Sequence, residues 1–383
     1  MTIEQQIAQE LSVKPNQVEA AVRLLDEGNT VPFISRYRKE ATGGLNDEQL
    51  RDLSERLTYL RNLQEKKETC LASIEEQGLL TEELKKAILE ATTQVAVDDL
   101  YRPYRPKRRT RATIAKEKGL EPLANIILLQ MTTKTREEEA KAFINPEKDV
   151  KSCDDAIAGA CDIIAESISD EATYRTWIRE ATFKKGRIVS KAKEEGTESV
   201  YEMYYDFDEN INKLPGHRVL ALNRGEKEKV LKVSIDAPVE DILRYLEKNV
   251  IHKDNMNTNL YLKATCEDAY TRLIAPSIEN EIRNDLTEMA EDGAIKVFGK
   301  NLGQLLMQPP IAGRNVLGWD PAFRTGCKIA VIDATGKVLD TTVVYPTAPQ
   351  NKVEETKKVI KALIKKHNVT LISLGNGTAS RES

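Results

Sequence analysis

The sequence predicts a mainly helical, multidomain protein with a small α/β part at its C-terminal end. Its composition is the first indication, because 31% charged and only 5% aromatic residues are typical of helices whose charges cover solvent-exposed faces. Apolar residues recur every three or four positions over most of the chain before residue 310, as they do in amphipathic helices. After Gly313, short β-branched runs broken by glycine and proline indicate strands. With 383 residues, the chain can hold two or three domains.

The first thirty residues predict two short helices. A short amphipathic helix is expected over 3–11, and a second helix is expected to begin near Pro15 and to end at Gly28. Two helices joined by a tight turn form a helix-turn-helix shape. They can equally pack on the core of a helical domain that reads no nucleic acid, and both interpretations stay open.

A cationic loop follows, with Arg36, Arg38 and Lys39 in a segment that Thr42-Gly43-Gly44 closes. These side chains could bind phosphate or hold neighbouring carboxylates in place. From 47 to 90 the pattern is again helical, with a cap expected at Asn46 or Asp47. Its buried face is predicted from the repeat Leu50, Leu53, Leu57, Leu60 and Leu63.

The strongest basic cluster lies between Tyr101 and Arg111, with no acidic residue inside it. Pro103 and Pro106 are predicted to keep this segment extended. A strip of guanidinium groups beside tyrosine rings suits phosphate contacts and stacking on unpaired bases. The alternative is a rigid connector that forms ion pairs with acidic helices. The cationic residues of this segment are Arg102, Arg105, Lys107, Arg108, Arg109 and Arg111.

The central part of the chain predicts a β-hairpin and a long helix. Two apolar runs, 218–223 and 230–235, are separated by Arg224-Gly225-Glu226-Lys227, which is typical of a turn. A helix is expected over 259–291 with a light break at Pro276, and another helix is expected after it.

The C-terminal part predicts a sheet with the order strand, strand, strand, helix, strand. The first strand is expected to end at Asp320, because Pro321 cannot donate a hydrogen bond to a neighbouring strand. A hairpin over 327–345, a helix over 351–367 and a strand over 369–374 follow. A ribonuclease-H-like sheet begins with this order and carries metal-binding acids after its first and fourth strands.

Several long motifs resemble the Tex family of bacterial transcription accessory proteins. GWDPAFRTGCK at 318–328 and GNGTASRE at 375–382 are similar to its YqgF domain, which is ribonuclease-H-like. VPFISRYRKE at 31–40, DLYRPYRPKRRTRAT at 99–113 and LPGHRVLALNRGE at 214–226 resemble other parts of Tex.

The resemblance implies three regions. These are a helical N-terminal region over 1–190 with the helix-turn-helix-like segment, a central region over 191–310 with the hairpin and long helix, and an incomplete YqgF domain over 311–383. The family continues with the rest of that domain, helix-hairpin-helix modules and an OB-fold RNA-binding domain, so we expect the chain to be truncated within the YqgF fold. Apolar residues are then expected to be exposed around Ile329, Val331, Leu371 and Leu374.

The leading functional hypothesis is a non-catalytic, transcription accessory scaffold that binds RNA or DNA without sequence specificity and contacts the transcription machinery. A net charge of −4 argues against a uniformly basic surface, so a local patch must make the contact. The N-terminus has no basic leader and no long apolar stretch, which predicts a cytoplasmic protein without a membrane partner. We expect no cofactor, no small-molecule substrate and no bound metal, since the three histidines and five cysteines form no paired ligand spacing.

Two other functions remain open. The first is a magnesium-dependent nuclease or resolvase-type enzyme centred on Asp320. Against it, the position after the fourth strand holds Asn376, a weaker magnesium ligand than a carboxylate, and Ala322 replaces the glycine usual in Tex. We therefore expect a degenerate site. The second treats Gly318 to Gly326 as the phosphate loop of an actin-like nucleotide-binding sheet.

Overall fold

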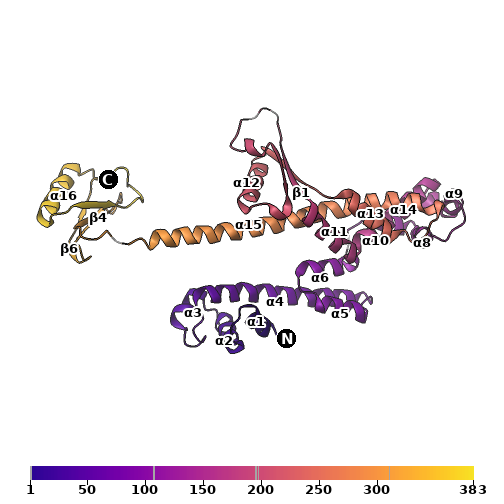
Figure 1. Cartoon of the computed structure of the whole chain (residues 1–383), viewed down its shortest axis with the longest axis horizontal. Coiled ribbons are helices and arrows are strands. Elements are labelled where there is room, and N and C mark those ends of the chain that lie inside the picture. The colour runs from indigo at the N-terminus through magenta and orange to yellow at the C-terminus, as the bar shows by residue number, and fades with distance from the viewer. Residues whose placement is uncertain (1, 107, 195, 197, 310) are drawn as a thin grey trace. The chain divides into compact units, whose positions relative to one another are not determined.

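The structure is a computed structural model that describes residues 2–106, 108–194, 196, 198–309 and 311–383. It divides into two compact units, residues 1–294 and 295–383. Helices dominate, and small sheets complete the fold, which confirms the predicted class (Figure 1). The domain boundaries at 190 and 310 stay predictions. Within the described residues, no helix is both long and apolar enough to cross a membrane.

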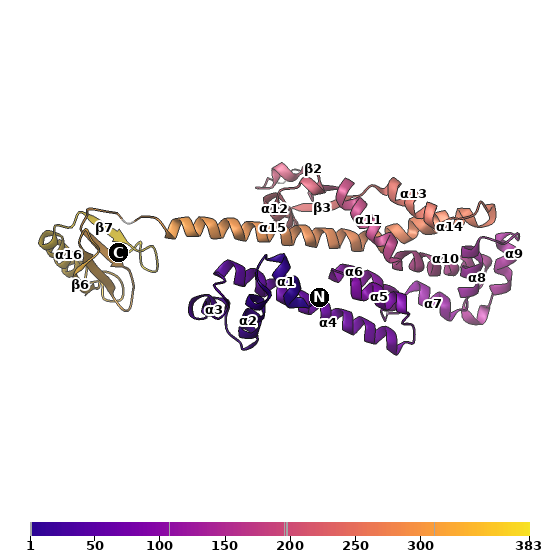
Figure 2. The ribbon, with the colours of Figure 1, turned by 60° about the horizontal axis from the view of Figure 1, so that its bottom comes forward.

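The N-terminal helices pack around one long helix. Asn46 caps α4 as predicted, and Leu50, Leu53, Leu57 and Leu60 face α1, α2 and α3 in one buried cluster. A second cluster, with Leu63 at its edge, joins the C-terminal half of α4 to α5 and α6 (Figure 2). The two predicted helices at the N-terminus are present, joined by residues 11–14. The elements are α1 (Ile3–Glu10), α2 (Pro15–Asp26), α3 (Val31–Tyr37), α4 (Asp47–Glu76), α5 (Glu82–Glu90) and α6 (Gln94–Tyr101).

The largest core of the first unit lies among the helices that follow α6. Alanine and isoleucine side chains of α10 form its centre, and α7, α8, α14 and the start of α15 pack around them. These helical elements are η1 (Arg102–Tyr104), α7 (Arg111–Glu117), α8 (Glu121–Leu129), α9 (Arg136–Ala140), η2 (Lys141–Phe143), η3 (Pro146–Lys148), α10 (Cys153–Asp170), α11 (Ala172–Lys185), η4 (Glu202–Tyr204), η5 (Ile211–Lys213), α12 (Gly216–Lys227), α13 (Val239–Val250), α14 (Met256–Asp268) and α15 (Ala275–Leu306).

The predicted long helix is present and longer than expected. A π-helical segment, Ala269–Ile274, joins α14 directly to α15, so the two expected helices form one run that ends at Leu306. The break expected at Pro276 is this π-helical segment. Proline has no N–H to donate to the carbonyl four residues earlier, and a π-helical turn is one way to absorb that loss.

The hairpin predicted over 218–235 is wrong. Residues 218–223 lie inside α12, with Val219, Leu222 and Gly225 on its buried face at helical spacing. The second run is a strand, β3, but it pairs with β1 in an antiparallel sheet of order β2-β1-β3. The strands are β1 (Arg187–Ala192), β2 (Asp206–Asn210) and β3 (Leu231–Asp236).

The second unit holds a four-stranded mixed sheet of order β6-β5-β4-β7. β4 pairs antiparallel with β5 and parallel with β7, and α16 connects β6 to β7, which confirms the predicted order of elements. Its elements are β4 (Val316–Asp320), β5 (Cys327–Ile332), β6 (Val338–Val344), α16 (Val353–His367) and β7 (Leu371–Leu374).

One expectation about this sheet is half wrong. Ile329 and Val331 were expected to be exposed, but they are buried against Ile360 and Leu363 of α16. Leu374 is 43% exposed, as expected, because it lies on the edge strand. A single helix therefore covers the centre of one face of the sheet.

Candidate nucleic-acid interface

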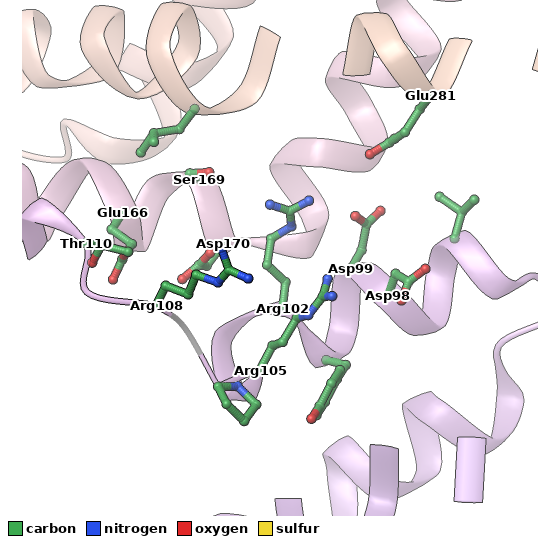
Figure 3. A pocket seen from close by; sticks show the side chains of 14 residues that line it. Asp98, Asp99, Arg102, Arg105, Arg108, Thr110, Glu166, Ser169, Asp170 and Glu281 are labelled. Carbon is green, nitrogen blue, oxygen red and sulfur yellow. The ribbon is translucent and has the colours of Figure 1, made fainter. Parts of the chain in front are cut away.

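A pocket of about 570 Å³ lies beside α6 and the residues that follow it, and α10 and α15 also line it (Figure 3). The side chains that project into it include Arg102, Arg105 and Arg108, and we call this cavity the arginine pocket. Three of the predicted cationic residues therefore meet at one place. The carboxylates that also line the pocket are Asp98, Asp99, Glu166, Asp170 and Glu281.

A buried ion cluster forms one wall of the pocket. Arg175 of α11 donates from Nε to Asp99 Oδ1 at 3.0 Å and from Nη2 to Glu281 Oε1 at 3.0 Å. Arg179, one helical turn later, donates to Asp99 Oδ2 at 2.8 Å and to Glu281 Oε2 at 2.8 Å. We call these four residues the ion cluster. It joins α6, α11 and α15, and its two cations and two carboxylates balance each other.

Arg102 lies next to the ion cluster but takes no part in it. Its guanidinium makes no hydrogen bond or ion pair with any described residue. Burial lowers the pKa of Arg102, and the cation of Arg175 lowers it further, while the carboxylates of Asp99, Asp170 and Glu281 act in the opposite direction. An arginine stays protonated at neutral pH, so this site holds a partly desolvated cation that an added anion would stabilise.

The other cationic residues of the segment divide into two groups. Arg105 and Arg108 are exposed and form no ion pair within 4 Å in the described part of the chain. Arg109 is different, because its Nη2 lies 3.5 Å from Glu117 Oε2 on the surface. Arg111 is the first residue of α7 and lies outside the pocket lining. Lys107 lies outside the described residues.

The predicted extended strip is wrong in its first part, although Arg105 has the expected extended backbone. Arg102–Tyr104 form a 3₁₀ turn that continues α6, with Pro103 inside it, because proline's fixed φ suits the first turn of a helix. Tyr101 and Tyr104 pack on the cluster between α4 and α6, and the Tyr101 hydroxyl lies 2.8 Å from Ser73 Oγ. These two rings therefore have a packing role, whereas the sequence predicted that they could stack on unpaired bases.

The cationic loop near residue 38 is partly a helix. Arg36 lies in the last turn of α3, and Arg38 and Lys39 follow it. All three are exposed, none lines the arginine pocket, and none forms an ion pair with a described residue. The Arg38 guanidinium carbon lies 5.3 Å from the centre of the Phe33 ring, which holds it by a cation–π contact.

Asp320 and Asn376 lie near each other at one edge of the C-terminal sheet. Asp320 is the last residue of β4, and Asn376 follows the parallel strand β7 by two residues. The Gly375 N–H donates to the Trp319 carbonyl at 2.8 Å, which ties the two strand ends together. Within the described residues, no three histidine, cysteine or carboxylate side chains gather closely enough to hold a metal ion.

Three Tex domain models match the chain in sequence order. The Tex-like protein N-terminal domain matches residues 1–75, the Tex central region-like domain matches 131–298, and the Tex protein YqgF-like domain matches 314–383. The chain belongs to the Tex family. This confirms the resemblance inferred from the motifs, and it makes the chain a member of a transcription accessory family with a YqgF-like domain.

Relatives from three bacteria agree with this assignment. The uncharacterized protein YdcI of Bacillus subtilis is 50% identical over 100% of this chain and 53% of its own length. Protein tex of Bordetella pertussis is 44% identical over 99% of this chain and 50% of its own length. The transcriptional accessory protein Tex of Neisseria gonorrhoeae is 41% identical over 100% of this chain and 51% of its own length. The chain therefore spans about half the length of these Tex relatives.

The sequence indicated the arginines of the pocket but not the ion cluster beside them. One signal was available. Arg175 shares the buried face of α11 with Ile178 and Thr182 at helical spacing, and an arginine on an apolar face requires a buried acid as its partner. Nothing in the sequence indicated that this acid would be Asp99, 76 positions earlier in the chain.

Proposed function

We propose that this Tex-family chain is a non-catalytic scaffold that binds nucleic acid without sequence specificity through the arginine pocket, in the cytoplasm and in contact with the transcription machinery. The observation that carries the proposal is Arg102, a partly buried cation without an ion-pair partner among the described residues. The name of the Neisseria gonorrhoeae relative supports the transcription role.

The charges around the pocket favour a phosphate. The ion cluster is balanced, and Lys66 Nζ lies 2.5 Å from Asp98 Oδ2, so neither contributes a net charge. The three arginines of the pocket outnumber the two other carboxylates that line it, Glu166 and Asp170. Guanidinium groups bind phosphate oxygens through two parallel hydrogen bonds, and a backbone phosphate carries no sequence information.

Asn376 supports the non-catalytic part of the proposal. Phosphodiester hydrolysis by two metal ions requires several carboxylates to hold them, and at this edge of the sheet Asp320 has a neutral amide as its neighbour. Incubation of a labelled strand with Mg²⁺ or Mn²⁺ is therefore expected to leave it intact. Metal-dependent cleavage that disappears in Asp320→Asn would replace this proposal with the nuclease function.

The binding proposal is tested by fluorescence anisotropy of labelled single-stranded RNA and duplex DNA over a salt series. The variant Arg105→Ala/Arg108→Ala removes two exposed cations that pair with no described residue, so it should preserve the fold. We expect weaker binding and a salt slope for the single strand that falls by about 1.4, from roughly 0.7 per phosphate contact.

The matched control is Arg51→Ala/Lys86→Ala, which removes the same charge from two exposed surface ion pairs. It should change affinity and slope much less. Equal losses in both double variants would mean that only the net charge matters. Unchanged binding in Arg105→Ala/Arg108→Ala would overturn the assignment of the site.

A further inference from the structure

A second hollow, of about 490 Å³, lies on the surface between α11 and α13 and shares no lining residue with the arginine pocket. The two helices run antiparallel. Tyr174 Oη donates to the Asn249 carbonyl at 3.2 Å near one end, and Lys185 Nζ lies 2.6 Å from Asp241 Oδ2 at the other. We call this hollow the α11–α13 groove.

Aromatic rings form part of its wall. The rings of Trp177 and Tyr245 stack with centres 3.9 Å apart and planes inclined by 4°, and both line the groove. The centres of the Tyr174 and Tyr245 rings lie 6.0 Å apart, with the two rings edge to face. The Tyr174 side chain is held in turn by the hydrogen bond from its hydroxyl to the Asn249 carbonyl. The edge contact limits rotation of the Tyr245 ring, so part of the aromatic surface is already ordered before a ligand binds.

Basic side chains line the same groove as the aromatic stack. Four basic side chains and two carboxylates line the groove, which gives it a net charge of +2 although the whole chain carries −4. Asp241 is already engaged by Lys185 and by Arg244 at 3.6 Å. Lys184 and Lys248 are exposed and form no ion pair within 4 Å in the described part of the chain. The groove therefore has two lysines available on its rim.

We propose that the α11–α13 groove binds single-stranded nucleic acid, with an unpaired base against the Trp177–Tyr245 stack and neighbouring phosphates on Lys184 and Lys248. Aromatic platforms combined with basic side chains are the usual means of holding unpaired strands, because every base has a π face and every nucleotide a phosphate. Its volume lies within the range of small-ligand sites, which suits one nucleotide of a longer strand. An acidic peptide would engage the lysines but leave the ring surface unused.

The chain offers a direct optical test, because it contains only two tryptophans, Trp177 and Trp319. In the variant Trp319→Phe, fluorescence reports the groove alone. Titration with oligo(dT) and oligo(U) at low salt should quench Trp177 saturably. The two strands distinguish DNA from RNA as the source of the ligand. In this background, Lys184→Ala/Lys248→Ala should lower the affinity obtained from the quenching titration about tenfold. The control Lys227→Ala/Lys232→Ala removes two exposed lysines outside the groove and should leave that affinity unchanged.

A second measurement tests stacking itself. Trp177→Leu is introduced into the Arg105→Ala/Arg108→Ala variant, and the affinity for the labelled strand is measured by anisotropy. We expect the affinity to fall roughly fivefold to a hundredfold, because stacking of one base contributes about 1–3 kcal/mol. Quenching that survives in Arg105→Ala/Arg108→Ala supports the groove even if the arginine pocket binds nothing. Absence of quenching, or equal quenching by polyglutamate, would overturn the proposal, the latter in favour of an acidic protein partner.

Discussion

Arg175 shows how one side chain sets the geometry of the candidate interface. It is fully buried, and it spans from Asp99 on α6 to Ser277 and Glu281 on α15. Asp99 precedes Arg102 by three residues, one helical turn, so the ion cluster fixes the point from which Arg102 enters the pocket. Nη1 of Arg175 has no hydrogen-bond partner among the described residues, which adds to the free-energy cost of burying this cation.

Replacing Arg175 should therefore be costly. Arg175→Met retains the apolar stem but leaves Asp99 and Glu281 with Arg179 alone, and removing one member of a buried ion pair typically costs about 3–5 kcal/mol. Urea unfolding followed by circular dichroism measures the loss. Arg109→Met serves as control, because its surface pair with Glu117 contributes less than about 1 kcal/mol. Similar losses in both variants would contradict a structural role for the ion cluster.

For single residues, the sequence predicted where charged and polar side chains lie better than it predicted which residues they contact. The positions of Asp320 and Asn376 at strand ends followed from an apolar run and a proline, which are local signals. The clustering of Arg102, Arg105 and Arg108 followed from their density in the chain. The buried partner of Arg175 and the stacking of Trp177 on Tyr245 join residues far apart in sequence, so no local pattern could indicate them.

At the scale of elements, the two apolar runs over 218–223 and 230–235 led to a wrong prediction of a hairpin, because the first run is part of the helix α12. Gly225 was interpreted as a turn residue, but it lies in the helix where the backbone approaches Leu231 of β3. An added Cβ would lie 2.6 Å from Leu231 Cδ1 and 2.8 Å from Leu231 Cγ, so the glycine serves close packing. Periodicity predicted the helices of regular length well. It failed for α12, which is as long as α2, because the apolar run over 218–223 is short enough to match a strand as well as a helix.

Gly225→Ala should consequently destabilise the first unit. Overpacking a core typically costs about 1–3 kcal/mol, and with Leu231 Cδ1 only 2.6 Å from the added Cβ we expect the cost to exceed the roughly 1 kcal/mol that alanine gains in helix propensity. Gly293→Ala, at a helical position of α15 with no atom within 4 Å of the added Cβ, should instead gain up to about 1 kcal/mol. Thermal unfolding of the two variants would show opposite shifts, and stabilisation by both would refute the packing role of Gly225.

At the scale of the whole molecule, each compact unit has its own hydrophobic core. In the first unit the largest core gathers around α10, and in the second Leu317, Cys327, Ile329 and Val331 pack under α16. The change from helical to strand periodicity after residue 310 predicted that a separate fold begins there. The division observed at 294 and 295 falls inside α15, where the helical pattern continues and the sequence gives no signal.

Separate cores predict separate responses to mutation. Leu317 is fully buried at the centre of the second unit, so Leu317→Ala should destabilise that unit by about 2–5 kcal/mol. The free energy of unfolding of the first unit should change by less than about 0.5 kcal/mol, since mutations in cores that share no contacts do not couple. Each unit contains one tryptophan, so Trp177→Phe leaves a reporter of the second unit and Trp319→Phe a reporter of the first. Denaturant unfolding of Leu317→Ala in these two backgrounds should shift only the Trp319 transition. Equal shifts of both transitions would mean that the two units unfold as one cooperative structure, and the proposed nucleic-acid sites of the first unit would then depend on the YqgF-like sheet.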